Sequence, residues 1–240
     1  MIAKGGYCSY GQDLGILMLD TTFPRLPGDI GNAKSFPFPV CYKRVPGASP
    51  KRVVEEADPS LLEPFIAVAR ELETEGVRAI TTSCGFLALF QQELAASVNV
   101  PLFSSSLLQI PLLYEIFGRR GKVGVLTARS ASLTELHFRN CGVQGIPLAV
   151  AGMDEQPEFT RVFLDKSEPG MEPRLDVKRA EAELKNVAAA LAAEEPEIRF
   201  IVLECTNMPP FKKAIQEASG KPVFDIISLA GFIHSGLLGS

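Results

Sequence analysis

Two cysteines in matching contexts are the residues of this sequence with the clearest potential for chemistry. Cys84 lies in the run ITTSCGFLALF, residues 80–90, and Cys205 lies in IVLECTNMPPF, residues 201–211. Each thiol follows an apolar, strand-like run and precedes a helix-like one, so we expect each at a strand-to-helix corner. The pKa of a free thiol is about 8.5, and a helix N-terminus lowers it. One thiolate can then remove a proton from carbon while a second thiol delivers a proton to the opposite face.

The spacing of these cysteines indicates an internal repeat. Cys205 follows Cys84 by 121 positions, and Pro222 follows Pro101 by the same 121 positions. Four further identical pairs share this offset: Arg78 with Arg199, Ile80 with Ile201, Phe90 with Phe211, and Phe103 with Phe224. Such a repeat predicts two similar halves. If the halves face each other about a pseudo-twofold axis, the two thiols approach one ligand from opposite sides.

Strand-like and helix-like segments alternate along the chain. Apolar runs rich in Val, Ile, Leu and Phe predict buried strands at residues 14–19, 77–82, 100–105, 122–127, 199–204 and 222–227. Amphipathic segments predict helices at residues 59–75, 86–97, 130–140 and 174–194. This order is typical of an α/β protein whose mostly parallel sheets are flanked by helices.

The repeat and the alternating elements together predict two pseudo-symmetric domains with the active site in the cleft between them. We expect a first α/β half at residues 1–112 and a second at residues 113–228. Residues 229–240 are expected to form a C-terminal segment that packs back on the first half. Ligands of parallel sheets bind at the carboxyl ends of the strands, where both cysteines are predicted to lie.

Composition and charge argue against several classes of protein. The 240 residues are 46% hydrophobic and 22% charged, with a net charge of −4, which disfavours a nucleic-acid surface and a disordered chain. No segment has the pattern of an export signal or a membrane span, and five cysteines without framework spacing indicate reduced thiols in the cytoplasm. Metal-ligand spacing and nucleotide-binding motifs are missing, so we expect neither metal nor organic cofactor. We expect a small-molecule partner and, for so apolar a chain, a homo-oligomer.

Small polar residues flank both cysteines. They are Thr82 and Ser83 before Cys84, and Thr206 and Asn207 after Cys205. Gly85 and Thr206 directly follow the thiols, where backbone N–H groups at a helix start can hold a carboxylate and stabilise enolate-like charge. The flanking residues therefore predict a site for an anion.

The paired corners SCG and ECTNMP, in two repeated α/β halves, resemble the aspartate/glutamate racemase superfamily. This superfamily contains cofactor-independent amino-acid racemases, hydantoin racemases, arylmalonate decarboxylases and maleate isomerases. The resemblance implies that Cys84 and Cys205 are a catalytic pair between two domains. It also implies that Asp20 and Thr21 match the polar pair that ends the first strand, and that Thr127 matches the threonine after the strand that opens the second half.

The sequence also departs from the pattern of glutamate racemases, which typically read A-C-N-T and G-C-T-H at the two corners. Gly85 and Phe86 replace the Asn and Thr, and Asn207 replaces the His. The first change removes side chains that would hold an amino acid, so glutamate itself is not expected as the substrate. Phe86 indicates a more apolar or bulkier substrate.

Because both thiols are present, the resemblance favours a racemase or epimerase that acts on a small carboxylate-bearing compound, such as an amino acid or a derivative. A maleate-type cis–trans isomerase or a decarboxylase of the same superfamily is the alternative. Two further interpretations stay open at this point: a binding protein without turnover, and a duplication whose cysteines are merely packed in the core.

The stretch at residues 23–47 is rich in Pro and Gly, so we expect it to lack regular structure and to form a flap over the site. Arg25, Lys43 and Arg44 are its candidates for contact with an anionic substrate, and at least two of the three are expected to be solvated surface charges. His137 and His234 are not expected to be catalytic bases. Cys141 is expected to be structural, and Cys8 and Cys41 have no partner that the sequence identifies.

Overall fold

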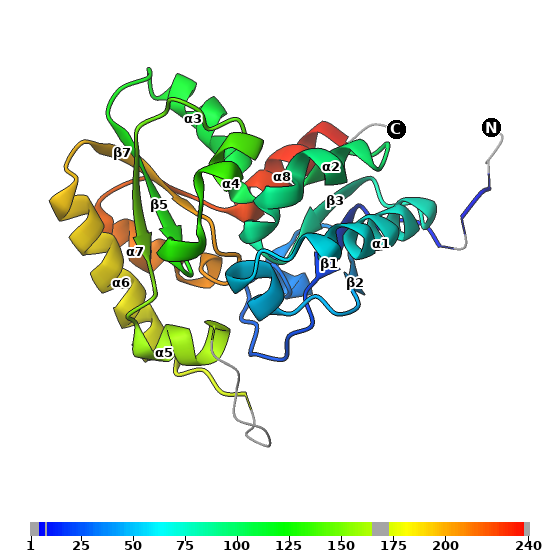
Figure 1. Ribbon diagram of the computed structural model, residues 1–240, viewed down its shortest axis with the longest axis horizontal. Coiled ribbons are helices and arrows are strands. Elements are labelled where there is room, and N and C mark those ends of the chain that lie inside the picture. Colours follow the sequence, from blue (N-terminus) through cyan, green and yellow to red (C-terminus); the bar gives the residue numbers. More distant parts are fainter. Residues whose placement is uncertain (1–4, 8, 165–172, 238–240) are drawn as a thin grey trace.

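The computed structural model describes residues 5–7, 9–164 and 173–237 (Figure 1). Its described strands form two parallel sheets of four strands each. The first sheet has the order β2 (Val40–Arg44), β1 (Leu14–Met18), β3 (Ala79–Thr82), β4 (Leu102–Phe103). The second has the order β6 (Leu148–Gly152), β5 (Lys122–Thr127), β7 (Ile198–Leu203), β8 (Val223–Phe224). The predicted α/β class with two similar, mostly parallel sheets is confirmed.

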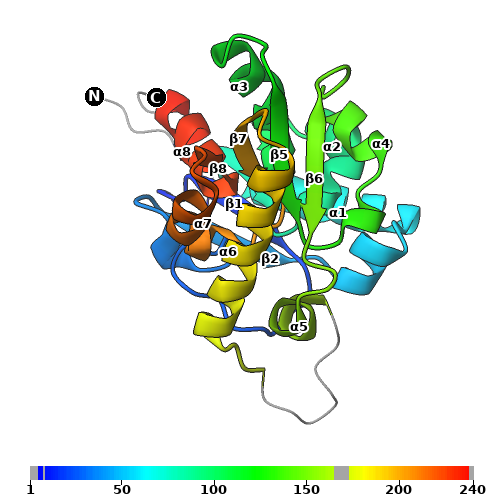
Figure 2. The ribbon, with the colours of Figure 1, turned by 90° about the vertical axis from the view of Figure 1, so that its left-hand side faces the viewer.

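Helices flank both sheets. Their bounds are α1 (Leu62–Thr74), α2 (Gln91–Ala96), α3 (Ile110–Ile116), α4 (Glu135–Asn140), α5 (Pro157–Phe159), α6 (Val177–Glu194), α7 (Lys212–Ser219) and α8 (Ile226–Leu237). In the first half, α1 packs against β1 and β2, and α8 packs against β3. In the second half, α6 packs against β5, β6 and α7, and Figure 2 shows it crossing in front of this sheet.

The two sheets repeat one strand order with an insertion in the second half. β1 and β2 recur as β5 and β6 at a displacement of 108 residues, since Leu14 corresponds to Lys122 and Val40 to Leu148. The ends of β3 and β7 are displaced by 121 residues, from Thr82 to Leu203. The second half therefore holds 13 more residues (121 − 108) between its second and third strands. The insertion lies in the connection that contains α5 and α6.

Two strands were not predicted from the sequence. β2 lies within the stretch 23–47, so the prediction that this stretch lacks regular structure is wrong. β2 is an edge strand whose side chains are partly exposed, so it can contain Lys and Arg. Without a buried apolar run, the sequence pattern does not distinguish it from the surrounding proline-rich stretch. β6 is the corresponding edge strand of the second sheet, and its mixed burial conceals it in the same way.

Four helices were also missed, and two predicted strands are reduced to two residues each. The missed helices are α3, α5, α7 and α8. The run 100–105 forms a strand only at Leu102–Phe103. The run 222–227 forms a strand only at Val223–Phe224, because Asp225 caps the start of α8. The Asp225 carboxylate accepts a hydrogen bond from the Ser228 N–H at 2.7 Å.

The C-terminal helix α8 packs on the first sheet. Its Leu229 and Ala230 share a buried cluster with Leu14 and Phe103, and His234 Nε2 lies 3.0 Å from the Asp13 carboxylate. The expected boundary after residue 112 falls inside α3, and the division into domains stays a prediction. Cys8 and residues 238–240 of the expected C-terminal segment lie outside the described residues.

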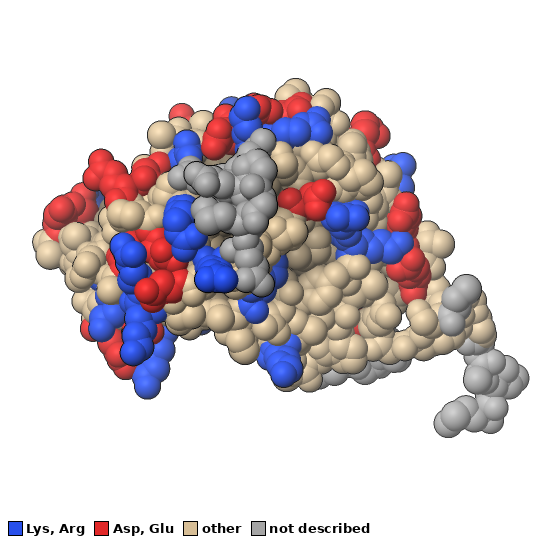
Figure 3. Space-filling model, turned by 90° about the horizontal axis from the view of Figure 1, so that it is seen from below, with Lys and Arg blue, Asp and Glu red and all other residues tan. Residues whose placement is uncertain are grey.

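The described surface shows no single-sign charge field in the view from below. Figure 3 shows acidic and basic side chains interspersed on this face. Among the described residues, no helix combines the length and the apolar character needed to cross a membrane. The expected homo-oligomer stays a prediction.

Shortening a buried side chain of α8 is expected to destabilise the fold. Leu229 is 7% exposed, so Leu229→Ala should lower the free energy of unfolding by about 2–5 kcal/mol. The shorter side chain leaves a cavity and gives up the apolar contacts of the leucine. Phe232 on the same helix is 61% exposed, and Phe232→Ala should change stability by less than about 0.5 kcal/mol. Urea titration followed by circular dichroism measures both. Equal effects would contradict the packing of α8 on the first sheet.

Candidate active site

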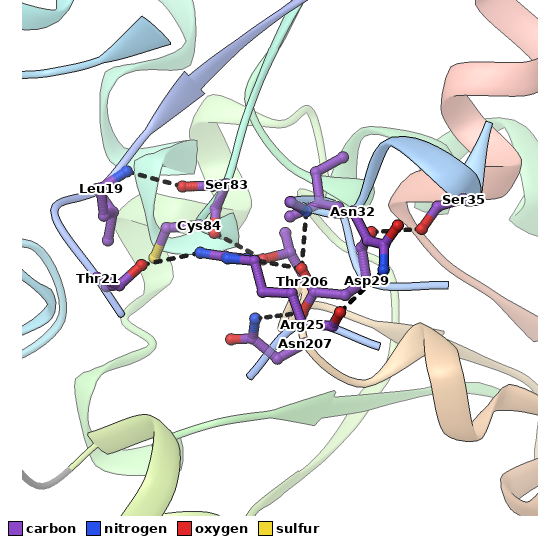
Figure 4. Close-up of polar contacts among 12 residues, drawn as sticks. Leu19, Thr21, Arg25, Asp29, Asn32, Ser35, Ser83, Cys84, Thr206 and Asn207 are labelled. Atoms are coloured by element: carbon purple, nitrogen blue, oxygen red, sulfur yellow. Dashed lines mark hydrogen bonds and ion pairs between the residues drawn. The ribbon is translucent and has the colours of Figure 1, made fainter. Parts of the chain in front are cut away.

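Both cysteines lie where the third strand of each sheet ends. Cys84 follows β3 and Cys205 follows β7, as the repeat predicts. The two strand ends meet directly, because Thr206 Oγ1 donates a hydrogen bond of 2.6 Å to the Ser83 carbonyl across 123 residues of chain (Figure 4). The corners of the two halves therefore form a single structural unit.

A pocket of about 440 Å³, part of it open to solvent, lies between these corners. Its lining contains both thiols and most of the residues that the sequence singled out: Thr21, Ser83, Cys84, Gly85, Phe86, Cys205, Thr206 and Asn207. All four cysteines among the described residues, Cys41, Cys84, Cys141 and Cys205, are free thiols. The thiol of Cys84 is partly exposed and that of Cys205 is buried.

Three of the expected site residues do not line the pocket. Asp20 lies at the surface beside it and pairs with Arg44 at 3.1 Å. Thr82 is buried, and its hydroxyl lies 2.7 Å from the Ser104 carbonyl, so it holds strand ends together. Thr127 is buried behind the pocket and donates a hydrogen bond of 2.7 Å to Oε2 of Glu204.

Arg25 is the cation of the pocket, and its position is fixed by three groups. Its Nη1 lies 2.6 Å from Asp29 Oδ1, and its Nη2 donates to Thr21 Oγ1 at 2.9 Å (Figure 4). Its guanidinium carbon lies 4.6 Å from the ring centre of Phe23. Only 13% of the side chain is exposed, so Arg25 presents a preformed positive charge to a ligand.

The same carboxylate connects Arg25 to the second thiol. Asn207 Nδ2 donates to Asp29 Oδ2 at 2.7 Å, which turns the amide oxygen Oδ1 toward Cys205. The Cys205 thiol donates to that oxygen at 3.7 Å. Because an amide oxygen only accepts hydrogen bonds, this contact favours the neutral thiol at Cys205 in the empty pocket.

The other two candidate cations of the stretch 23–47, Lys43 and Arg44, do not line the pocket. Lys43 pairs with Glu71 and Glu75 on α1 and next to it, and Arg44 pairs with Asp20. Lys43 and Arg44 thus lie outside the pocket lining, in line with the expectation that at least two of the three cations are surface charges. Residues before β2 contribute Phe23 and Arg25 to the lining, so only the first part of the stretch borders the site.

Glu204 is the pocket residue that the sequence analysis missed. It is 0% exposed, Thr127 donates a hydrogen bond to its Oε2, and the Ala128 N–H bonds the carboxyl group. Its Oε1 accepts no hydrogen bond from the described residues. Burial raises the pKa of this carboxyl from 4.5 to about 7. The available signal was an acidic residue at the end of the apolar run RFIVLE, directly before a cysteine.

Both thiols are less acidic than expected. Burial, with the Glu204 carboxylate as the next cause, raises the pKa of Cys84 to about 12 and that of Cys205 well above its usual value. The N–H groups of Phe86 and Asn207 lower these pKa values only in part. The expectation of thiols acidified by helix N-termini is wrong for the empty pocket, since Cys84 precedes only a 3₁₀ segment, Gly85–Phe90.

The remaining wall of the pocket is apolar and aromatic. Phe23 and Phe163 form an edge-to-face pair with ring centres 5.0 Å apart. Phe86 contacts His137 in a similar geometry at 5.6 Å. His137 itself accepts the Thr134 N–H at Nδ1 over 3.1 Å and so caps α4, which gives it a structural role.

Two curated relatives show which proteins this chain resembles in sequence. A dimethylsulfoniopropionate lyase of Durusdinium sp. clade D is 33% identical over 232 residues, which cover 94% of this chain and 75% of the relative. Dimethylsulfoniopropionate lyase 7 of Emiliania huxleyi (strain CCMP1516) is 30% identical, covering 98% and 70%. No protein-family model matches the chain.

Solved structures agree on the fold. Allantoin racemase from Klebsiella pneumoniae superposes with a TM-score of 0.65 at 14% identity, covering 95% of this chain and 88% of that one. A putative Asp/Glu racemase from Yersinia pestis gives 0.61 at 14% identity, covering 95% and 100%. Unliganded arylmalonate decarboxylase gives 0.59 at 14% identity, covering 95% and 93%. The fold is that of the aspartate/glutamate racemase superfamily, as the resemblance predicted.

The function predicted from that resemblance is wrong. The relatives identified by sequence are lyases, whereas the prediction was a racemase or epimerase, which is an isomerase. The structural neighbours at 14% identity support the fold alone. A pair of thiols in this fold is compatible with several reactions, so its presence did not identify the reaction.

The contact between Gly85 and Glu204 leaves no room for a side chain. A Cβ at Gly85 would overlap the main-chain oxygen and Oε1 of Glu204. We expect Gly85→Ala to lower the free energy of unfolding by about 1–3 kcal/mol, because the corners must move apart. The control is Gly231→Ala on α8, where a Cβ has no neighbour within 4 Å and should stabilise the protein by up to about 1 kcal/mol. A neutral effect of Gly85→Ala in urea titration would refute the close contact.

The buried carboxyl of Glu204 should make stability depend on pH. Its pKa is raised from 4.5 to about 7, so its favourable contribution is complete below about pH 4.5 and is lost as the pH rises through 7. Glu204→Gln replaces the carboxyl group by an amide that does not ionise, so it removes this loss of stability at high pH. It should raise the free energy of unfolding of the ligand-free protein by on the order of 2 kcal/mol at pH 8, and by much less at pH 5. Denaturant titrations at both pH values test this, and an equal change at both would argue against a raised pKa.

Proposed function

We propose that this chain, which belongs to the dimethylsulfoniopropionate lyase family, cleaves the carbon–sulfur bond of dimethylsulfoniopropionate by β-elimination. One structural observation supports the proposal in addition to the sequence similarity. A single pocket combines a fixed guanidinium, two thiols and three phenylalanine rings. This composition suits a small substrate with a carboxylate at one end and an apolar, hydrogen-bond-free cation at the other.

The proposed substrate contains a carboxylate and a dimethylsulfonium group separated by two methylene carbons. In β-elimination a base takes a proton from the carbon next to the carboxylate. The C–H electron pair forms the new double bond, and the electrons of the carbon–sulfur bond leave with sulfur. The products are neutral dimethyl sulfide, acrylate and the proton held by the base. Charge and atoms balance without an oxidant or a reductant.

Arg25 is proposed to bind the carboxylate. Its guanidinium is oriented by Asp29 and Thr21 before a ligand arrives, which reduces the entropic cost of binding. Pairing with the guanidinium also stabilises the negative charge that develops on the carboxylate as the proton leaves. Main-chain N–H groups at the corners add to this stabilisation.

The phenylalanine side of the pocket is proposed to hold the sulfonium group. Phe23, Phe86 and Phe163 line the pocket, and aromatic faces attract cations that have little hydration to lose. Dimethyl sulfide is uncharged and apolar, so the same wall accommodates the leaving group after the bond breaks.

A thiolate of the cysteine pair is proposed as the base. Burial and the Glu204 carboxylate raise the pKa values of both thiols, which favours their neutral forms. A sulfonium ion in the pocket counteracts this effect, because a nearby positive charge lowers the pKa of a thiol. Substrate binding would thus generate the base that consumes the substrate. The free thiols are consistent with a reducing compartment, and we propose the cytoplasm.

The two cysteines should contribute unequally, because elimination needs one base and no proton donor on the opposite face. We expect Cys84→Ala and Cys205→Ala to differ. The variant without the base should lose at least about 100-fold in kcat, and the other should retain measurable turnover. Gas chromatography of dimethyl sulfide released from dimethylsulfoniopropionate measures both, with Cys41→Ala as the control outside the pocket. No release by the wild-type protein would refute the lyase.

A further inference from the structure

One carboxylate oxygen of Glu204 has no hydrogen-bond partner among the described residues. The strand end after β7 positions the side chain, Thr127 donates a hydrogen bond to Oε2, and the Ala128 N–H bonds the same carboxyl group. Oε1 is fully buried and accepts no hydrogen bond within the described residues. A buried acceptor without a hydrogen-bond partner destabilises the folded protein, so an unpaired oxygen at a pocket calls for a functional explanation.

No described cation neutralises this carboxyl group. Arg25 is paired with Asp29, and no ion pair within the described part of the chain includes Glu204. The lining of the same pocket contains Gly85, the two thiols, the phenylalanine side chains and one cation, Arg25, which is paired with Asp29. Gly85 packs directly against Oε1, since a Cβ there would overlap this oxygen.

We propose that the Glu204 carboxylate is the counter-charge for the sulfonium group and makes the pocket specific for an onium cation without N–H donors. This inference rests on the proposed function and names the residue that selects its substrate. A primary ammonium would need a hydrogen-bond acceptor for each N–H, and Oε1 of Glu204 is the single buried side-chain oxygen that lacks a partner among the described residues. A sulfonium ion needs only charge and apolar contact, because its positive charge is spread over methyl and methylene hydrogens.

Arg25 and Glu204 line the same pocket, so one pocket offers a partner for each charge of a zwitterion. Arg25 is already paired with Asp29, whereas no ion pair of the described residues includes Glu204. A zwitterion can then bind with its carboxylate at Arg25 and its cation at Glu204. Burial raises the pKa of the Glu204 carboxyl, and a bound cation would favour its ionised form.

The test compares two ligands that differ in charge and little in shape. Dimethylsulfonioacetate carries the sulfonium, and 3-methylbutanoate replaces the sulfur by an uncharged carbon. Neither can undergo this β-elimination, so isothermal titration calorimetry measures binding alone. The wild-type protein should bind the sulfonium at least about tenfold more tightly. Glu204→Gln should reduce that preference at least about tenfold while changing the affinity for 3-methylbutanoate by less than about twofold.

Two further variants separate charge from structure. Glu135→Gln removes one exposed negative charge on α4, outside the pocket, and should leave the preference intact. Glu204→Asp keeps the charge and should retain part of the preference. If Glu204→Gln does not fold, Glu204→Asp and the wild-type preference still decide the question.

Three results would overturn the role of Glu204: equal affinity of the wild type for both ligands, equal weakening of both in Glu204→Gln, and loss of turnover in that variant with the preference unchanged. The last result would instead assign Glu204 to proton transfer. Dimethyl sulfide release by the wild type is measured separately. Release without a sulfonium preference overturns only this inference, and a preference without release overturns only the lyase.

Discussion

The site depends on a contact between two strand ends that is too close for a side chain. Gly85 of the first half lies against the main chain and the carboxylate of Glu204 in the second. The hydrogen bond from Thr206 to the Ser83 carbonyl holds the same corners together. Because these residues are far apart in the chain, the pocket exists only when both sheets have formed. The thiols, the buried acid and the aromatic wall all derive their environment from this contact.

The electrostatics of the pocket follow from the burial of its ionisable groups. One cation, Arg25, is neutralised by Asp29, and one acid, Glu204, has no neutralising partner among the described residues. In such surroundings the neutral forms of thiols and carboxyls are favoured, which explains the raised pKa values of Cys84 and Glu204. A ligand that brings its own charges therefore alters the protonation of the site.

The sequence was informative where local pattern and repetition decide the structure. The offset between Cys84 and Cys205 predicted the paired strand ends, and apolar runs predicted the six more buried strands of the two sheets. Edge strands such as β2 were missed because half-exposed side chains lack a distinctive apolar pattern. The position of Arg25 and the burial of Glu204 arise from contacts across the chain, which no local pattern records. The reaction was misjudged because the resemblance carried by the two thiols identified the fold, whereas the relatives identified by sequence are lyases.

The insertion between β6 and β7 makes the two halves unlike at the place where they face each other. Its connection supplies Phe163 and Leu164 to the pocket, while the first half supplies Pro50 and Val54. A ligand therefore meets two different walls and has one preferred way to lie between them. The carbon next to the carboxylate in an achiral substrate carries two hydrogens that are mirror-related and chemically equal in solution. Inside an asymmetric pocket with a single base, they become distinguishable, so the enzyme would be stereospecific in a reaction whose substrate and products have no handedness.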